Sequence, residues 1–297
     1  MQHHANICAF DSSQPWSICS PIEASIKRKI EAVGKPLKDW DIKIYRGILT
    51  GCNEAFIIDE GKRNEILSHC KTKSEREKTE QLIRPILRGR DIKRYKAEWA
   101  KLYLIATFPS RHYNIDDYPA VKEYLLSFGK ERLEQTGKEY IVNGERIKAR
   151  KKTSNKWFET QDSISYWEDF LKQKIVWARL MRMAKNDIDN FPRFSTADSE
   201  MYVVDSLCFF TGKNIDKLCI VLNSEYAAYY FFSHVAVLDN GGFQMRQQYV
   251  ENIPIPNTIN INKEEDVYAA FGFNHEEVSY IKTVVAKRKN EIVSRAE

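Results

Sequence analysis

One stretch near the start of the chain, residues 42–59, constrains what the chain can fold into more than any other segment does. Apolar and polar residues alternate at its beginning, which is the pattern of a strand with one buried face. The turn-forming residues Thr50-Gly51-Cys52-Asn53 follow, and the apolar run Ala55–Ile58 completes the stretch. We therefore predict a strand, a tight turn and a second strand. Gly47 and Gly51 mark places where a Cβ atom would obstruct the turn or a closely approaching backbone, of a neighbouring strand or of a ligand.

The composition is that of an ordinary globular protein. The 297 residues are 43% hydrophobic and 29% charged, which is enough apolar material for one large or two modest domains and argues against disorder. Lys and Arg number 46 against 41 Asp and Glu, a net charge of +5. This surplus is too small by itself to establish a polyanionic partner, so the distribution of the charges matters more than their total.

Cysteine spacing and hydropathy indicate the cellular compartment. The six cysteines show no C-x-x-C spacing, so the sequence suggests neither a zinc ribbon nor a redox pair, and reduced thiols fit a cytoplasmic protein best. No apolar run approaches the roughly 18 residues that a membrane span needs, and the first residues do not resemble a signal peptide. We therefore expect a cytoplasmic chain with no membrane partner.

Hydrophobic spacing predicts several helices and strands. The first helix begins with a capping box at Ser20, has Pro21 at its first position and ends at Gly34. Further helices are expected over 59–67 and 74–87, from Pro119 to Phe128, from Asn214 to Tyr229, and over 264–272 and 275–297. Apolar runs with β-branched and aromatic residues predict strands over 102–107, from Lys174 onward and over 201–210.

Residues 83–95 carry five Arg or Lys side chains and one acid around Gly89, which permits a sharp turn of the backbone. Two interpretations are open for this segment. It is a solvated helix end whose arginines complement the carbonyl dipole, or it is a basic loop with a role in binding.

Residues 144–157 concentrate positive charge more strongly. Six basic side chains stand there against one acid, and their surplus of five equals that of the whole chain. Such a run, with Trp157 beside it, suits contact with phosphates, sugars or base edges, although charge runs are also common on solvated faces. Arg179, Arg182 and Lys185 recur at every third residue, so a helical turn would bring them together and a strand would divide them between its faces.

Residues 239–256 form the last segment of interest. Asn240-Gly241-Gly242 demands positive φ angles, and the following bend lets Gln244 or Arg246 project toward a partner. Gln and Arg have the bidentate geometry that reads adenine and guanine. The same polar residues would also suit a turn that faces only water.

Three of these segments resemble the TaqI-like C-terminal specificity domain. Residues 47–58 are similar to its opening motif, residues 83–95 match its Arg-Pro-hydrophobic-Leu-Arg-Gly-x-Asp-Ile-Lys-x-Tyr motif nearly letter for letter, and residues 241–256 resemble its closing segment. Lys156-Trp157-Phe158-Glu159 also resembles a Trp-aromatic-Glu element of the family. The resemblance runs from about Trp40 to Asn257.

This resemblance implies the DNA target-recognition region of adenine-specific restriction-modification methyltransferases, with double-stranded DNA as the partner. It implies an α+β fold with a twisted, mostly antiparallel sheet system and peripheral helices. We expect an N-terminal helical lead-in over 1–39, the target-recognition domain over 40–257 and a C-terminal helical segment over 258–297. The parent protein would use S-adenosylmethionine to methylate an adenine, in a methyltransferase domain present in cis or in trans. No cofactor is expected in this chain.

The chain carries no recognisable catalytic motif. It has neither the Gly-rich cofactor loop nor the Asn/Asp-Pro-Pro-Tyr/Phe motif of an adenine methyltransferase, and Asp189-Asn190-Phe191-Pro192 is no substitute. Asp41 with Glu60-Gly61-Lys62 is a poor match to the carboxylates and lysine that hold a metal ion in nucleases of the PD-(D/E)-x-K type. Asp59-Glu60 stands where the family begins an acidic helix, which explains these acids better. His and Cys spacings indicate no metal site. We predict no catalytic and no metal-binding residue in this chain, and endonuclease activity of the parent protein stays open.

The candidate DNA-binding residues come from local chemistry, because specificity domains differ from one another in the residues that read bases. They are Lys148, Arg150, Lys151, Lys152, Lys156, Trp157, Arg179, Arg182, Lys185, Gln244 and Arg246. Two functions of other classes stay open. One is a freestanding nuclease or other hydrolase whose site forms only in three dimensions, and the other is a protein-interaction module of a phage-defence complex.

Overall fold

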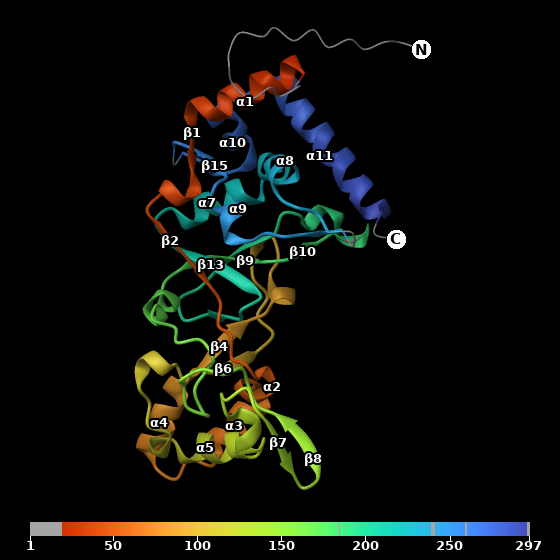
Figure 1. Cartoon of the computed structure of the whole chain (residues 1–297). Helices are drawn as coiled ribbons and strands as arrows, with labels where there is room; N and C mark the ends of the chain where they lie inside the picture. The colour runs from red at the N-terminus through yellow and green to blue at the C-terminus, as the bar shows by residue number, and fades with distance from the viewer. Residues whose placement is uncertain (1–19, 184, 239–240, 259, 296–297) are drawn as a thin grey trace.

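The computed structural model of the chain describes residues 20–183, 185–238, 241–258 and 260–295. The molecule is elongated, and its two larger sheets follow one another along its length (Figure 1). The sheet in the upper half of the view has five strands. In spatial order these are β2 (Ile42–Arg46), β13 (Leu207–Gly212), β9 (Lys174–Ala178), β11 (Phe194–Ala197) and β5 (Tyr95–Lys96).

A layer of helices covers the upper end of the molecule (Figure 1). It consists of α1 (Pro21–Val33), α7 (Ile215–Asn223), α8 (Glu225–His234), α10 (Glu264–Phe271) and α11 (His275–Arg295). Helix α7 packs on β5, β9 and β11, and α8 joins α7 to α11. Two strand pairs and one short helix complete this part: β1 (Gly34–Pro36) with β15 (Pro254–Pro256), β10 (Met181–Arg182) with β14 (Gly242–Phe243), and α9 (Gln247–Val250). The five-stranded sheet and these elements are called the upper lobe.

The lower lobe is built around a four-stranded sheet (Figure 1). Its strands are, in spatial order, β12 (Tyr202–Val203), β4 (Ile83–Leu87), β6 (Leu102–Ile105) and β3 (Ile57–Asp59). Around it lie α2 (Asn53–Phe56), α3 (Glu60–Ser68), α4 (Lys73–Leu82), α5 (Pro119–Leu126) and α6 (Lys130–Leu133), with the hairpin of β7 (Glu139–Val142) and β8 (Glu145–Lys148) at the edge. Strands β5 and β11 pair in parallel, as do β4 and β12, and the other ladders of the described residues are antiparallel. The predicted α+β fold with a mostly antiparallel sheet system is confirmed.

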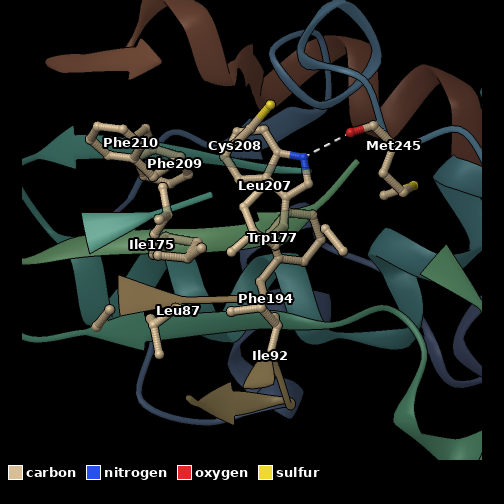
Figure 2. Close-up of a cluster of buried hydrophobic side chains, with 14 of the residues drawn as sticks. Leu87, Ile92, Ile175, Trp177, Phe194, Leu207, Cys208, Phe209, Phe210 and Met245 are labelled. Atoms are coloured by element: carbon tan, nitrogen blue, oxygen red, sulfur yellow. Dashed lines mark hydrogen bonds between the residues drawn. The ribbon is translucent and has the colours of Figure 1, made fainter. Parts of the chain in front are cut away.

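Aromatic side chains fill the core of the five-stranded sheet (Figure 2). Trp177 and Phe194 come from neighbouring strands, and their ring centroids lie 5.8 Å apart. The Trp177 Nε1 donates a hydrogen bond of 2.8 Å to the Met245 carbonyl, so the buried ring satisfies its polar atom and ties the segment before α9 to the sheet. Leu87 and Ile92, from the basic segment 83–95, belong to the same buried cluster. This segment therefore contributes to the hydrophobic core as well as carrying charge.

Several predictions about single elements are confirmed. Helix α1 begins with the capping box, in which the Ser20 side chain accepts from the Glu23 backbone and the Glu23 carboxylate accepts from Ser20. Helix α3 has Asp59 as its N-cap, and α10 ends at Gly272 in the left-handed region. The predicted helices at 119–128 and 275–297 and the strands at 102–107 and from Lys174 also appear, as α5, α11, β6 and β9. The three predicted domain limits stay a prediction.

Other predictions are wrong because the chain changes direction inside an apolar run. The helix expected over 74–87 ends with α4 at Leu82, and its last part is strand β4, as Pro85 would favour. The strand expected over 201–210 is two short strands, β12 and β13, which belong to different sheets. The helix expected from Asn214 to Tyr229 breaks at Ser224 into α7 and α8, and the Asn214 side chain makes no capping hydrogen bond.

The organising stretch 42–59 does not form two paired strands. Strand β2 belongs to the five-stranded sheet, one turn of helix (α2) follows the Thr50-Gly51 turn, and β3 belongs to the four-stranded sheet. The chain therefore crosses from the upper lobe to the lower lobe at Gly47. Several later segments also connect the two sheets, and the one between β12 and β13 lies against the crossing at Gly47: Gly47 N donates to Leu207 O at 2.9 Å and Ile48 N donates to Val203 O at 2.8 Å.

The two crossings are so close that only glycine fits at position 47. A Cβ atom there would lie 2.0 Å from the Val204 carbonyl oxygen and 2.7 Å from that of Val203. Both neighbours are backbone atoms, which cannot move without breaking the hydrogen bonds of the crossing. The prediction that Gly47 permits the close approach of a neighbouring backbone is confirmed.

Gly47→Ala is expected to lower the free energy of unfolding by at least about 2 kcal/mol, because the added methyl group forces the two crossings apart. Gly61→Ala is the matched control. Its Cβ would meet only an Asp59 side-chain oxygen at 3.4 Å, and it lies inside helix α3, where alanine stabilises by about 1 kcal/mol. Urea unfolding followed by circular dichroism measures both. A Gly47→Ala protein as stable as the wild type would contradict the tight crossing.

Lys174, at the start of β9, is fully buried, and its Nζ donates to the Asp198 carbonyl at 2.8 Å. Burial lowers the pKa of this lysine from 10.5 to about 8. Because the unfolded chain holds the proton more tightly, the contribution of Lys174 to stability rises with pH between about 8 and 10.5. Lys174→Met is expected to abolish this rise and to add about 1–3 kcal/mol to the free energy of unfolding at pH 7. Urea unfolding of both proteins across this pH range tests it, and identical pH dependence would refute it.

Candidate nucleic-acid interface

The crossing between the lobes carries two arginines that contact the same residue, Asp205. Arg46, the residue before Gly47, lies 3.6 Å from the Asp205 carboxylate, and the Arg179 guanidinium donates to the Asp205 carbonyl at 3.2 Å. Burial raises the pKa of the nearby Cys208 thiol to about 11, and the positive charges of Arg179 and Arg46 act in the opposite direction. Both guanidinium groups therefore stand beside the same crossing, with the Arg46 side chain 46% exposed.

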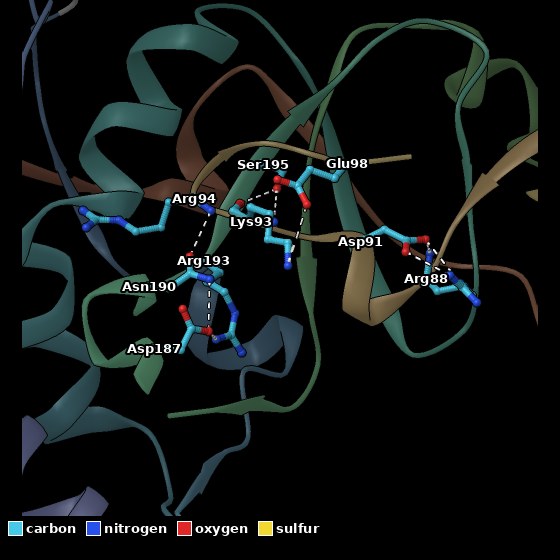
Figure 3. Close-up of polar contacts among 9 residues, drawn as sticks. All are labelled: Arg88, Asp91, Lys93, Arg94, Glu98, Asp187, Asn190, Arg193 and Ser195. Carbon is cyan, nitrogen blue, oxygen red and sulfur yellow. Dashed lines mark hydrogen bonds and ion pairs between the residues drawn. The ribbon is translucent and has the colours of Figure 1, made fainter. Parts of the chain in front are cut away.

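The basic segment 83–95 is a link between the sheets and not the end of a helix. Strand β4 leads into the short 3-10 helix η2 (Gly89–Asp91) and then into β5 of the other sheet. Figure 3 shows how Arg88 and Asp91 close the turn, with the buried Asp91 carboxylate accepting from the Arg88 backbone at 2.8 Å and from its guanidinium at 3.2 Å. This pair explains why the motif places an acid three residues after its arginine.

The second half of the segment is held by side chains of the five-stranded sheet and of the 3-10 helix η6 (Lys185–Asn190) (Figure 3). Ser195 Oγ accepts from the Lys93 backbone N–H and donates to the Lys93 carbonyl. The Arg94 guanidinium donates to the backbone carbonyls of Asp189 and Asn223. The charges of Arg88 and Arg94 therefore support the chain itself, and the exposed Arg90 makes none of these contacts.

The basic segment 144–157 begins with the second strand of a hairpin. Asn143 and Gly144 form its turn, both with positive φ, and Arg146 pairs with Glu139 across the strands at 3.2 Å. Four predicted residues of this segment are exposed: Lys148, Lys151, Lys152 and Lys156. Trp157 is half-buried and packs edge-on against Phe158 with ring centroids 5.6 Å apart. The lysines are therefore available to phosphates, and Trp157 is only partly so.

The prediction that Arg150 contacts a phosphate is wrong, because this side chain is 5% exposed and fully used inside the protein. Its guanidinium donates to the carbonyls of Leu133, Thr50, Glu159 and Trp157, at distances between 2.6 and 2.8 Å. Burial lowers the pKa of Arg150 to about 10, so it remains charged at neutral pH. Arg150 thus fastens the lysine-rich segment to the Thr50-Gly51 turn, about a hundred residues earlier in the chain.

An open groove of about 340 Å³ lies where the two segments meet. Its walls come from the turn 51–54, from the segment 148–150 and from Arg132 of α6, whose guanidinium pairs with Glu54. Lys148 is the predicted residue that opens onto this groove. The organising stretch and the basic segment therefore form one continuous surface in the lower lobe.

The remaining predicted residues lie in the upper lobe. Arg179 follows β9 and faces the crossing, whereas Arg182 lies on β10 and Lys185 begins η6, so neither a helical turn nor one strand holds all three. Strand β10 pairs with β14, so Arg182 lies opposite Gly242. Gln244 and Arg246 follow β14 directly in the chain. Arg182, Lys185 and Arg246 are exposed, and Gln244 is half-buried.

Positive φ occurs at Gly241, as expected, but Gly242 lies in strand β14 and does not have it, whereas Asp239 and Asn240 lie outside the described residues. The candidate residues thus form two groups, one in each lobe, and Figure 1 shows the β7–β8 hairpin well separated from β10. We call them the lysine group (Lys148, Lys151, Lys152 and Lys156) and the β10–β14 group (Arg182, Lys185, Gln244 and Arg246).

Arg46 and Arg132 are not among the residues that the sequence patterns predict to bind DNA. The position of Arg46, directly before a glycine in the opening motif, was a usable signal. Arg132 offered none, because its place at the groove depends on α6 packing beside β8.

The described part of the chain offers neither a metal centre nor a membrane span. No three His, Cys, Asp or Glu side chains gather there in a way that could hold a metal ion. No helix of that part is both long and apolar enough to cross a bilayer. Four of its cysteines, Cys52, Cys70, Cys208 and Cys219, are free thiols.

The family model of the TaqI-like C-terminal specificity domain matches residues 84–255, more than half of the chain. The chain belongs to this family. The matched region contains the basic link between the sheets, the lysine group and the β10–β14 group. It begins after the opening stretch 42–59, whose resemblance to the family rests on its own residues.

Among solved structures, the type IIG restriction endonuclease BpuSI matches with a TM-score of 0.54 and 12% sequence identity, over 93% of this chain and 33% of BpuSI. The type IIL restriction-modification enzyme MmeI, in a structure in complex with DNA, matches with a TM-score of 0.45 and 8% identity, over 88% of this chain and 36% of MmeI. The likeness to BpuSI shows a shared fold. The chain spans about one third of the length of either enzyme. No curated protein sequence matches it.

Arg150→Ala is expected to lower the free energy of unfolding by about 3 kcal/mol, because it leaves several carbonyl groups, including that of Thr50, without their donor. Lys151→Ala, the neighbouring exposed residue, should change stability by less than about 0.5 kcal/mol. Denaturant unfolding compares the two. Equal, small effects would show that Arg150 does not fasten the basic segment.

Proposed function

We propose that this chain recognises a sequence in duplex DNA, as the specificity part of a restriction-modification adenine-N6 methyltransferase. The observation that carries the proposal is the lysine group, four exposed cations fixed to the family's opening turn by the buried Arg150. A flexible basic tail would attract any polyanion. Cations held at set positions on a rigid surface instead fix the register of a duplex through its phosphates.

The β10–β14 group supplies the chemistry for reading bases. Gln244 and Arg246 leave the paired strand β14 just before α9, and such side chains recognise adenine and guanine by two hydrogen bonds each in the major groove. Arg182 and Lys185, from the neighbouring strand and η6, add phosphate or base contacts. Trp157, next to Lys156 of the lysine group, and Arg179, which faces the crossing, are both partly covered and would add further contacts.

The chemistry of methylation belongs to another part of the parent protein. BpuSI is about three times as long as its matched region, and this chain holds none of the motifs that bind S-adenosylmethionine or a flipped adenine. We propose that a methyltransferase domain, in cis or in trans, supplies the cofactor and flips the base, in the cytoplasm, while this chain positions the target. Endonuclease activity of the parent protein is a separate question.

The test is binding of the whole chain to a randomised duplex pool at two salt concentrations, with sequencing of the retained DNA. Retained duplexes should share a motif, and affinity should fall steeply as salt rises, because each phosphate contact releases counterions. Absence of retention at both salt concentrations would contradict DNA recognition by this chain. Cleavage that requires a divalent metal would instead favour the nuclease hypothesis.

Affinity falls as salt rises, so the slope of log affinity against log salt is negative. Replacing all four lysines of the lysine group by Gln should make this slope shallower, by about 0.9 for each phosphate that the protein no longer neutralises. The matched control replaces four exposed lysines of the upper lobe, Lys27, Lys263, Lys282 and Lys287, by Gln, which changes the net charge equally. The control should keep the wild-type slope. An equal decrease in both proteins would show that only total charge matters.

A further inference from the structure

A second concave site lies in the lower lobe, apart from both predicted groups. It is a cavity of about 150 Å³ between α4, the start of β4, β12 and the 3-10 helices η3 (Pro109–Arg111) and η5 (Trp167–Leu171). Its polar lining includes Lys78, Arg84, Arg111, Tyr113, Trp167 and Tyr202. None of these residues was predicted to bind DNA.

The cations of this cavity form no close ion pairs with nearby acids. The Arg111 guanidinium lies over the Trp167 ring, 3.9 Å from its centroid, and has no acidic partner among the described residues. Arg84 approaches Glu200 only at 3.7 Å, and that carboxylate is 59% exposed. Lys78, exposed on α4, forms no ion pair within the described chain either. Three positive charges therefore face one loosely held negative charge.

A buried tyrosine completes the site. Tyr202 is 3% exposed, and its ring stacks on Phe170 with centroids 4.6 Å apart, so strand β12 and the core fix its position. Among the described residues its hydroxyl has no hydrogen-bond partner, and it is not one of the polar atoms buried away from solvent, so it is open to a ligand in the cavity. Arg84 and Arg111 line the same cavity as Tyr202. Burial raises the pKa of this tyrosine, and the positive charges of the two arginines oppose the rise.

We propose that this cavity binds a phosphoryl group. Guanidinium groups, an ammonium group and a tyrosine hydroxyl all donate hydrogen bonds, so they fit a ligand that is anionic and rich in acceptors, and guanidinium matches phosphate geometry in particular. The volume holds roughly five waters at about 30 Å³ each, enough for a phosphate and too small for a whole nucleotide. The rest of a larger ligand would leave through the open mouth.

The Trp167 ring gives this site its geometry. By holding the Arg111 guanidinium in place, it reduces the side-chain entropy that a mobile arginine would lose on binding. Two sources carry the required chemistry: a phosphate of DNA and a free phosphorylated small molecule. Because no residue of the lysine group or the β10–β14 group lines the cavity, this proposal and the proposed DNA recognition can fail separately.

Titration calorimetry with inorganic phosphate, in a buffer without other oxyanions, tests the site on the whole chain. Saturable binding is expected, and Arg84→Gln and Arg111→Gln should each weaken it at least about tenfold. Tyr202→Phe should weaken it by about threefold or more while leaving the fold intact, since the hydroxyl has no protein partner to lose. Arg28→Gln, at an exposed position on α1 in the upper lobe, is the control and should bind as the wild type does.

Duplex binding by the Arg111→Gln protein identifies the source. A parallel loss of duplex affinity would assign the site to a phosphate of DNA, and unchanged duplex affinity would assign it to a phosphorylated small molecule. Absence of saturable phosphate binding to the wild type would overturn the proposal. So would equal weakening by Arg28→Gln, or wild-type binding by the Tyr202→Phe and Arg111→Gln proteins.

Discussion

The structure depends on the contact between two stretches of backbone that cross between the lobes. At Gly47 and Val204 the two backbone segments are so close that no side chain fits between them, and hydrogen bonds between the segments keep them in contact. Strands on either side of each crossing belong to different sheets, so the contact fixes how one sheet is placed relative to the other. Arg46, Arg179 and Asp205 add charge at the same point. The spacing between the surfaces of the two lobes follows from this one contact.

The cations of the chain divide into those that hold the backbone and those that face water. Arg94 and Arg150 donate to carbonyl groups that secondary structure leaves unpaired, a task for which a planar guanidinium with several donors is well suited. Lys148, Lys151, Lys152 and Lys156, on either side of Arg150, are exposed, and their compact ammonium groups stay hydrated. Net charge and local charge density do not show which cations bind backbone carbonyls and which face water, because this depends on whether the side chain is buried.

Short sequence patterns predicted correctly those features that depend on a few neighbouring residues. The capping box at Ser20 fixed the start of α1, and the need for a bare glycine at position 47 followed from its place in the opening motif. The run 201–210 was predicted as one strand because apolar composition does not reveal that the chain changes sheets at residue 204. Arg150 was predicted to be exposed for the same kind of reason. Its partners come from segments up to a hundred residues away, which no local pattern contains.

The family motif and the candidate contact surfaces consequently have different roles. The Asp91 carboxylate closes a turn by accepting from Arg88, the Arg94 guanidinium donates to backbone carbonyls, and neither side chain is placed to read a base. A scaffold held in this way tolerates different side chains at the exposed positions of β8, β10 and the segment before α9, because these positions, unlike the buried Met181 and Met245, carry little of the packing. A partner that touches both lobes has to extend past the crossing between them. Duplex DNA, which is stiff over lengths far greater than a small domain, meets that requirement without bending.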